Sequence, residues 1–160
     1  LLRLTNNGRQ LFRILFNADP VESEWERLNR MHEGQRFPNH TIGILIFTLH
    51  ARVRGYETQI LPPVENTKAV PDLEIRRDEE HLYVEVELSS KEHVSKWVNI
   101  AAINGGRVAI CGLSTSRSER LVGDCKLKKL PGMATDIETL KSGSYEAMTE
   151  ETPLWAETWK

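Results

Sequence analysis

The sequence predicts an α/β fold in which a mixed central β-sheet is flanked by helices, and three observations support this. Residues 71–75 and 83–88 alternate apolar and polar side chains on either side of a charged turn, a pattern that predicts a β-hairpin. A continuous apolar run at 108–113 predicts a buried strand. Apolar residues recur at helical spacing in 42–53 and 94–101, which predicts two helices that pack on the sheet.

The N-terminal part is predicted to be helical. Residues 1–9 are interpreted as a short strand and a turn, and residues 10–16 as a helix. Asp19-Pro20 is expected to open a second helix, in which acidic residues come first and arginines last, as the helix dipole favours.

The long apolar helix and the first strand follow. Asn39 or Thr41 is expected to cap the helix, and Gly55 to end it. Residues 56–61 then predict the first strand of the sheet, ahead of the hairpin.

Two capping-box patterns, each a serine followed three residues later by a glutamate, appear after the hairpin. Ser89 with Glu92 is expected to begin the helix that precedes the buried strand, and Ser116 with Glu119 a helix after it. Residues 136–140 are a candidate for one more short helix, and the last part of the chain is predicted to be irregular. The resulting order of the core is α-β-β-β-α-β, and the connection through the first of these helices is long enough for a parallel crossover.

Length and composition limit the class of protein. With 160 residues the chain suits one domain with a sizeable core, and we divide it into an N-terminal helical segment at 1–37 and an α/β domain at 38–160. A net charge of −2 argues against a strongly basic nucleic-acid coat. No apolar run is long enough to cross a bilayer, and Cys111 and Cys125 form neither a disulfide framework nor a zinc motif. A cytoplasmic location is therefore expected, and the start at a leucine suggests a fragment of a longer protein.

Acidic side chains gather on one face of the predicted hairpin. Asp72 and Glu74 share a face of the first strand, and Glu85 and Glu87 share a face of the second. Carboxylates that lie close together repel one another unless a cation sits between them, so this face invites a hard divalent ion. The alternative is that the acids simply form the solvated face of a half-buried hairpin.

The order of these signals resembles the PD-(D/E)xK nuclease superfamily, whose motif would be formed by Pro71-Asp72, Glu85 and a lysine. Within it the chain most resembles the replication-relaxation family, which shares a Ser/Thr-Lys helix start and a Lys-aromatic pair, here Ser90-Lys91 and Lys96-Trp97. The similarity covers about residues 38–113. It implies a restriction endonuclease-like core.

The resemblance also implies roles for the site residues. Asp72, Glu85 and Glu87 are expected to hold Mg²⁺ or Mn²⁺. Glu87 stands where the family usually has lysine, and it is expected to act as a third ligand or a general base. Lys91 is the candidate for the missing catalytic ammonium, with an ordinary solvated lysine as the alternative, whereas Lys96 is expected to meet solvent or backbone phosphates.

The N-terminus carries a second resemblance. The pattern Leu4-Thr5-x-x-Gly8-Arg9 is similar to the closing strand and last helix of winged-helix DNA-binding domains. Residues 1–37 are then the remnant of such a domain, and an ordinary docked helix is the alternative.

Three functional hypotheses follow. The first is a metal-dependent DNA endonuclease or nicking domain of a plasmid or mobile-element replication protein. The second is a catalytically inactive nuclease-fold module that binds DNA or a replication protein, and the third is an unrelated α/β enzyme. The sequence also leaves open whether the chain forms a homodimer. The basic residues that could contact DNA are scattered, and they are Arg52, Arg54, Arg107, Arg117, Arg120, Lys126, Lys128 and Lys129.

Overall fold

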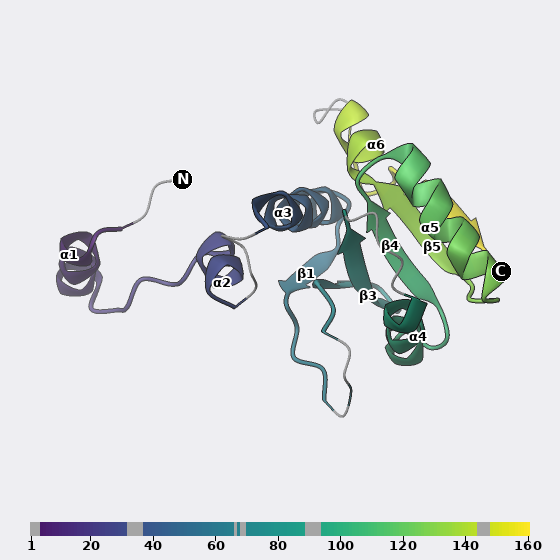
Figure 1. The fold of residues 1–160 in the computed structure, drawn as a ribbon. Coiled ribbons are helices and arrows are strands. Elements are labelled where there is room, and N and C mark those ends of the chain that lie inside the picture. The colour runs from purple at the N-terminus through teal and green to yellow at the C-terminus, as the bar shows by residue number, and fades with distance from the viewer. Residues whose placement is uncertain (1–3, 32–36, 66, 68–69, 89–93, 144–147) are drawn as a thin grey trace.

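The computed structural model describes residues 4–31, 37–65, 67, 70–88, 94–143 and 148–160 (Figure 1). Its helices are α1 (Asn6–Phe16), α2 (Glu24–Met31), α3 (Pro38–Val53), α4 (Val94–Ile103), α5 (Thr115–Leu127) and α6 (Ile137–Ser142). Its strands are β1 (Glu57–Ile60), β2 (Leu73–Arg77), β3 (Glu80–Glu87), β4 (Val108–Gly112), β5 (Gly132–Asp136) and β6 (Glu157–Trp159).

All the strands belong to one mixed sheet, whose order is β1-β2-β3-β4-β5-β6. The first three strands form an antiparallel meander. Strand β4 then pairs parallel to β3, β5 pairs parallel to β4, and β6 closes the sheet antiparallel to β5. The predicted α/β class with a mixed sheet is therefore confirmed. None of the helices in the described part of the chain combines the length and the apolar character that a membrane span requires.

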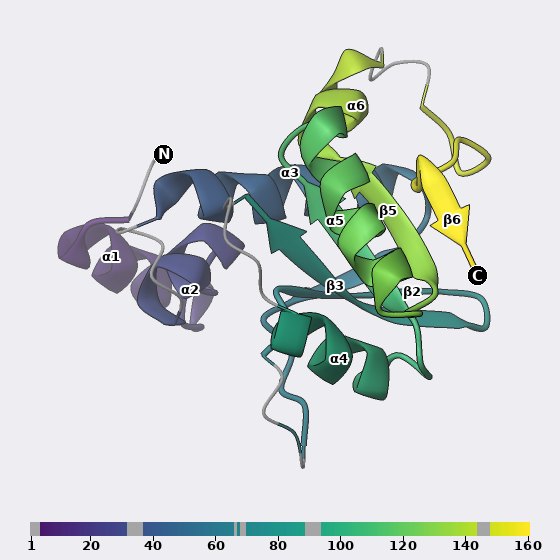
Figure 2. The ribbon, with the colours of Figure 1, turned by 45° about the vertical axis from the view of Figure 1, so that its right-hand side comes forward.

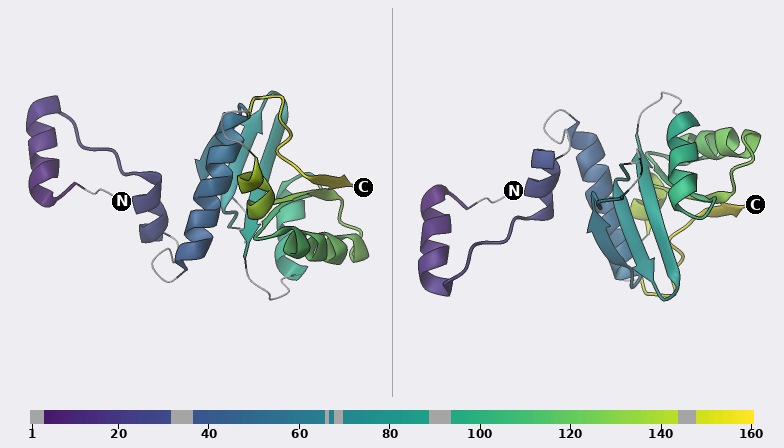
Figure 3. Two further views of the ribbon diagram at one scale, coloured as in Figure 1. Left: turned by 90° about the horizontal axis from the view of Figure 1, so that it is seen from above. Right: turned by 90° about the horizontal axis from the view of Figure 1, so that it is seen from below.

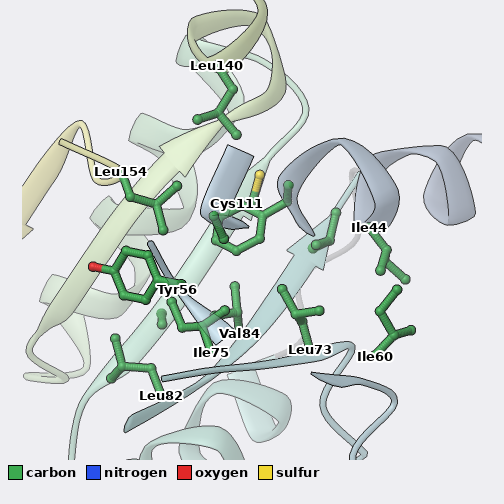
Figure 4. Close-up of a cluster of buried hydrophobic side chains, with 14 of the residues drawn as sticks. Ile44, Tyr56, Ile60, Leu73, Ile75, Leu82, Val84, Cys111, Leu140 and Leu154 are labelled. Carbon is green, nitrogen blue, oxygen red and sulfur yellow. The ribbon is translucent and has the colours of Figure 1, made fainter. Parts of the chain in front are cut away.

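Helices cover both faces of the sheet (Figure 3). On one face, α3 and α6 pack over a core that includes Ile44, Leu73, Ile75 and Val84 (Figure 4). On the other face, α4 and α5 enclose a second core around Trp97, with Val108, Ile110 and Leu121 among its members. Because both faces are covered, side chains from both sides of the central strands are buried.

The predicted hairpin of β2 and β3 is confirmed. Its strands extend further into the charged segment than the alternation suggested, so that β2 ends at Arg77 and β3 begins at Glu80. Only two residues remain for the turn, and Asp78 takes the left-handed conformation there with φ 54°. An aspartate tolerates this conformation better than most residues because its short side chain can bond locally.

The N-terminal prediction is corrected in two places. Helix α1 begins at Asn6, within the segment predicted as a turn, because the Thr5 hydroxyl accepts the N–H of Gly8 and caps the helix. The preceding strand cannot be assessed, since residues 1–3 lie outside the described residues. Helix α2 begins at Glu24, not near Asp19, because Ser23 and Glu26 bond reciprocally in a capping box.

Helix α1 lies apart from the sheet in every view (Figures 2 and 3). It has no buried residue, and its apolar side chains Leu11, Ile14 and Leu15 are exposed. The docked N-terminal helix that the sequence offered as an alternative is therefore not what the structure shows. A link to the next helix comes from Arg9, which pairs with Glu26 at 2.9 Å.

Two helix starts differ from prediction. Helix α3 begins at Pro38 with no side-chain cap, so neither Asn39 nor Thr41 has the expected capping role, because proline needs no N–H partner at this position. Helix α5 begins at Thr115, where Ser114 accepts the N–H of Arg117 and replaces the predicted cap at Ser116.

The C-terminal part holds two strands that the sequence did not predict. Strand β5 is buried along its whole length and contains glycine, alanine and aspartate, which are poor strand formers. It exists because β4 and β6 pair with it on either side. The short helix after it is confirmed as α6, and Asp136 caps it by accepting the N–H of Thr139 at 2.8 Å.

Gly132 is required by the close approach of β4 to β5. A Cβ at this position would overlap the carbonyl oxygen of Val108, so we expect Gly132→Ala to lower the free energy of unfolding by about 1–3 kcal/mol. Gly123→Ala in α5 is the control. A Cβ there would meet nothing within 4 Å, and the change should raise stability by about 0.5–1 kcal/mol. Urea denaturation measures both, and equal effects would contradict this account of Gly132.

Candidate active site

Four acidic side chains lie on the face of the hairpin that α4 covers. The register pairs Leu73 with Val84, and one further step places Asp72 opposite Glu85. Asp72, Glu85 and Glu87 are only 2%, 1% and 6% exposed. Glu74 is equally buried and is held by Arg76 and His81. The interpretation of these acids as a solvated face is therefore wrong, because the covering helix removes them from water.

Helix α4 is fixed over this face by two residues. Trp97 is buried among residues of β4 and α5, which sets the rotation of the helix. Near the C-terminal end of the helix, the side-chain amide of Asn104 accepts the Tyr83 N–H and donates to the Tyr83 carbonyl, both at 2.7 Å. These bonds pair the backbone N–H and carbonyl groups of Tyr83, which precedes the residues of β3 that pair with β4. They were not anticipated from the sequence.

Lys96 is the cationic side chain that contacts Glu85 and Glu87. Its Nζ lies 2.5 Å from Glu85 Oε2 and 3.6 Å from Glu87 Oε2, and its side chain is one-third exposed. We expected this lysine to meet solvent or backbone phosphates, but the adjacent Trp97 turns the helix so that Lys96 faces the acids. A lysine beside a buried tryptophan on a covering helix was the signal available in the sequence.

His40 joins the site from the opposite face of the sheet. Its Nε2 lies 3.2 Å from Asp72 Oδ2, and the same oxygen accepts the Val86 N–H at 2.9 Å. Because α3 starts at Pro38, its first turn places His40 beside the end of the hairpin. The His40 side chain and the Val86 amide therefore both help to hold Asp72 in place.

The two facing carboxylates have opposite pKa shifts. Burial alone would raise the pKa of Asp72, but His40, Lys96 and the Val86 amide outweigh it and hold the pKa below its ordinary value. Burial and the Asp72 charge raise the pKa of Glu85 well above its ordinary value, and Lys96 offsets this only in part. Asp72 is thus the stronger acid of the pair.

The two cationic side chains respond to these acids. Burial would lower the pKa of Lys96, but Glu85, Asp72 and Glu87 raise it above the ordinary value, so Lys96 is charged at neutral pH. Burial would likewise lower the pKa of His40, and the hydrogen bond and charge of Asp72 raise it instead. The carboxylates therefore raise the pKa of both cationic side chains that contact them.

A groove of about 650 Å³ opens beside these groups. It lies at the carboxyl ends of β3 and β4, and His40, Glu87 and Lys96 line it together with Lys141 of α6. The remaining lining is mostly apolar and includes Ile42, Ile46, Leu113 and Ile137. The carboxyl ends of parallel strands are the usual place for ligand sites in α/β sheets.

The carboxylates fit a magnesium ion better as a pair than as a trio. Among the described residues, no three His, Cys, Asp or Glu side chains are gathered as a metal-binding group. Magnesium commonly uses only one or two carboxylates, together with waters and phosphate oxygens. Glu85 Oε2 is buried without a well-directed hydrogen bond, although the Lys96 ammonium is close enough for an ion pair. Asp72 and Glu85 could therefore hold such an ion, and a ligand role for Glu87 stays a prediction.

Other residues singled out in the sequence lie elsewhere. Lys91 and Ser90 are outside the described residues, so the structure does not place the predicted ammonium of Lys91. Several of the scattered basic side chains are engaged within the fold. Arg52 pairs with Glu24, Arg54 is buried against Pro153 and His50, and Lys126 pairs with Glu157.

No protein-family model, curated protein or solved structure gives a significant match to this chain. Its chemistry therefore has to be inferred from the residues themselves, above all from the buried carboxylates and the ammonium beside them.

Removing the Lys96 charge should destabilise the fold. In Lys96→Met, Glu85 would remain buried beside Asp72 without its main cation, and we expect a loss of about 3 kcal/mol, the lower end for a broken buried pair. Lys126→Met is the control, because the Lys126–Glu157 pair is half-exposed and should contribute at most about 1 kcal/mol. Urea denaturation at neutral pH compares them, and equal losses would show that Lys96 is not a buried counter-ion.

The raised pKa of Glu85 predicts a pH dependence of stability. The folded chain keeps a proton on Glu85 that the unfolded chain releases above its ordinary pKa of 4.5, so this stabilisation is present below pH 4.5 and lost as the pH rises through the folded pKa. Glu85→Gln has no proton to release at this position, so it does not lose this stabilisation as the pH rises. The stability of the variant relative to wild type should therefore increase from pH 4.5 toward neutral. Urea denaturation measures both proteins. Because His40 titrates in both, its contribution to the pH dependence cancels to first order in the difference between their stabilities. A relative stability that falls over this range would mean that Glu85 is ionised throughout.

Proposed function

We propose that this chain is a metal-dependent DNA endonuclease or nicking domain that hydrolyses a phosphodiester bond at Asp72 and Glu85. The observation that carries the proposal is the buried pair of facing carboxylates with a lysine ammonium 2.5 Å from one of them. The order α3-β1-β2-β3-α4-β4 with the sheet order β1-β2-β3-β4 supports a restriction endonuclease-like core. Membership of a plasmid or mobile-element replication protein rests on the resemblance of the sequence motifs alone.

Asp72 and Glu85 bind the ion in this proposal. A bound Mg²⁺ or Mn²⁺ would polarise the scissile phosphate and lower the pKa of an attacking water. Asp72 suits the role because its low pKa keeps it ionised, and because His40 and the Val86 amide fix its orientation. Glu85 reaches the same place from the neighbouring strand.

Lys96 and Glu87 supply the remaining chemistry. Lys96 stays protonated because its pKa is raised, so it stabilises negative charge on the phosphate and does not act as a base. Glu87 lines the groove and can accept the proton of the water. The water oxygen then bonds to phosphorus while the bond from phosphorus to the leaving oxygen breaks, and the leaving oxygen takes up a proton from solvent.

A second candidate function is a catalytically inactive module that binds DNA or a replication protein. The contacts of Lys96 favour it, because the ammonium already neutralises Glu85 and Glu87 without a metal ion. The engaged basic residues and the net charge of −2 limit the affinity such a module could gain from phosphate contacts.

Nicking of supercoiled plasmid in Mg²⁺ or Mn²⁺ tests the first function. We expect Asp72→Asn and Glu85→Gln to abolish nicking, and Lys96→Met to slow it by about 10²–10³-fold, the loss typical of removing one electrostatic donor. A loss in Lys91→Ala larger than in Lys96→Met would instead give the ammonium role to Lys91.

The matched control for nicking is Glu74→Gln. Glu74 is a buried acid two residues after Asp72 and on the same face of the hairpin, but its partners are Arg76 and His81. This variant should nick at the wild-type rate once melting curves show that it is folded. An inactive wild type that still binds DNA would favour the second function, and activity in Asp72→Asn would remove support for the mechanism.

A further inference from the structure

The groove beside the carboxylates is larger and more apolar than phosphate hydrolysis requires. Its volume of about 650 Å³ falls within the range of pockets that hold whole small molecules. Its wall includes Ile42 and Leu113, which are 45% and 46% exposed. A surface that only tracks the backbone of duplex DNA would instead present mainly cationic and polar groups.

Charged groups stand on two sides of this apolar wall. Lys96 comes from α4 and Lys141 from α6, and these helices pack on opposite faces of the sheet. The groove therefore passes around the carboxyl end of β3, from Glu87 and Lys96 on one side to Lys141 on the other. Two ammonium groups with an apolar surface between them match a nucleotide, whose base is apolar on its faces and whose flanking phosphates are anionic.

We propose that the groove receives the base of an unpaired nucleotide next to the scissile phosphate, so that the substrate is single-stranded or locally unpaired DNA. The inference rests on the proposed function, since it assumes that the scissile phosphate lies at Asp72 and Glu85. A base in an intact duplex is stacked between its neighbours and cannot enter such a groove unless it is first unstacked.

The substrate class is tested by binding. Fluorescence anisotropy without divalent metal, so that no cleavage occurs, compares a labelled single strand of about 12 nucleotides with its blunt duplex. We expect the single strand to bind at least about fivefold more tightly, the effect of one stacked base. Equal or tighter binding of the duplex would overturn the proposal.

Two matched pairs of variants locate the binding surface. Ile42→Asn should weaken single-strand binding by about 5- to 100-fold, because it removes apolar surface that the base would cover. Leu49→Asn should leave it unchanged, because Leu49 is equally exposed on the same helix but lies outside the groove lining. Lys141→Gln should reduce the slope of log affinity against log salt by about 0.7, as expected for one lost phosphate contact with a single strand. Lys160→Gln should leave the slope unchanged, because Lys160 is exposed and lies outside the groove lining.

Further outcomes separate this proposal from its alternatives. Equal affinities of Ile42→Asn and Leu49→Asn would overturn the groove as a base site, while plasmid nicking by the wild type would still stand. Single-strand binding that depends on Ile42 without any nicking would support the groove and reject hydrolysis. If ultracentrifugation shows a wild-type dimer that Ile42→Asn dissociates, a second copy occupies the groove and the nucleotide assignment fails.

Discussion

The burial of two facing carboxylates is the constraint on which the rest of this site depends. Asp72 and Glu85 lie opposite each other on neighbouring strands and are almost inaccessible to water. Such a pair is strongly unfavourable unless cationic or hydrogen-bonding groups reach it. Lys96 provides one of these groups and His40 the other. The two helices that carry them, α4 and α3, must therefore hold their positions for the hairpin to keep its acids inside the fold.

The topology of the sheet explains why both helices arrive at the same place. Strand β4 runs parallel to β3, so the chain has to cross from the end of one strand to the start of the next, and α4 forms that crossover. Helix α3 packs on the opposite face, and its first turn lies at the same end of β3, where His40 meets Asp72. The site thus occupies the end of a central strand, with each face of the sheet contributing one cationic side chain.

The sequence predicts the parts of this arrangement that depend on local periodicity. The two-residue repeat of the hairpin placed Glu85 and Glu87 on one face and Asp72 opposite them, and the register agrees. Burial of that face could not be predicted, because it depends on a helix whose rotation is set by Trp97 and Asn104. The ion pair of Lys96 with Glu85 could not be predicted for the same reason, because it depends on the rotation of the helix. Strand β5 was missed for a related reason, since its pairing partners and not its composition make it a strand.

The unequal acidity of the two carboxylates connects stability with the proposed chemistry. Asp72 stays ionised because a histidine and a backbone amide bond to it, whereas Glu85 is pushed toward the protonated form by burial and by the charge of Asp72. Lys96, whose pKa these carboxylates raise, lines the groove. Perturbed pKa values in a cleft are typical of functional sites, although structural ion pairs also produce them. The opening of the groove to solvent distinguishes a functional site from a structural ion pair here. A purely structural pair gains nothing from an opening to solvent, but Glu87 and Lys96 line a groove large enough for a ligand. In the proposed reaction, the same lysine that forms an ion pair with Glu85 would also meet the scissile phosphate from the wall of the groove.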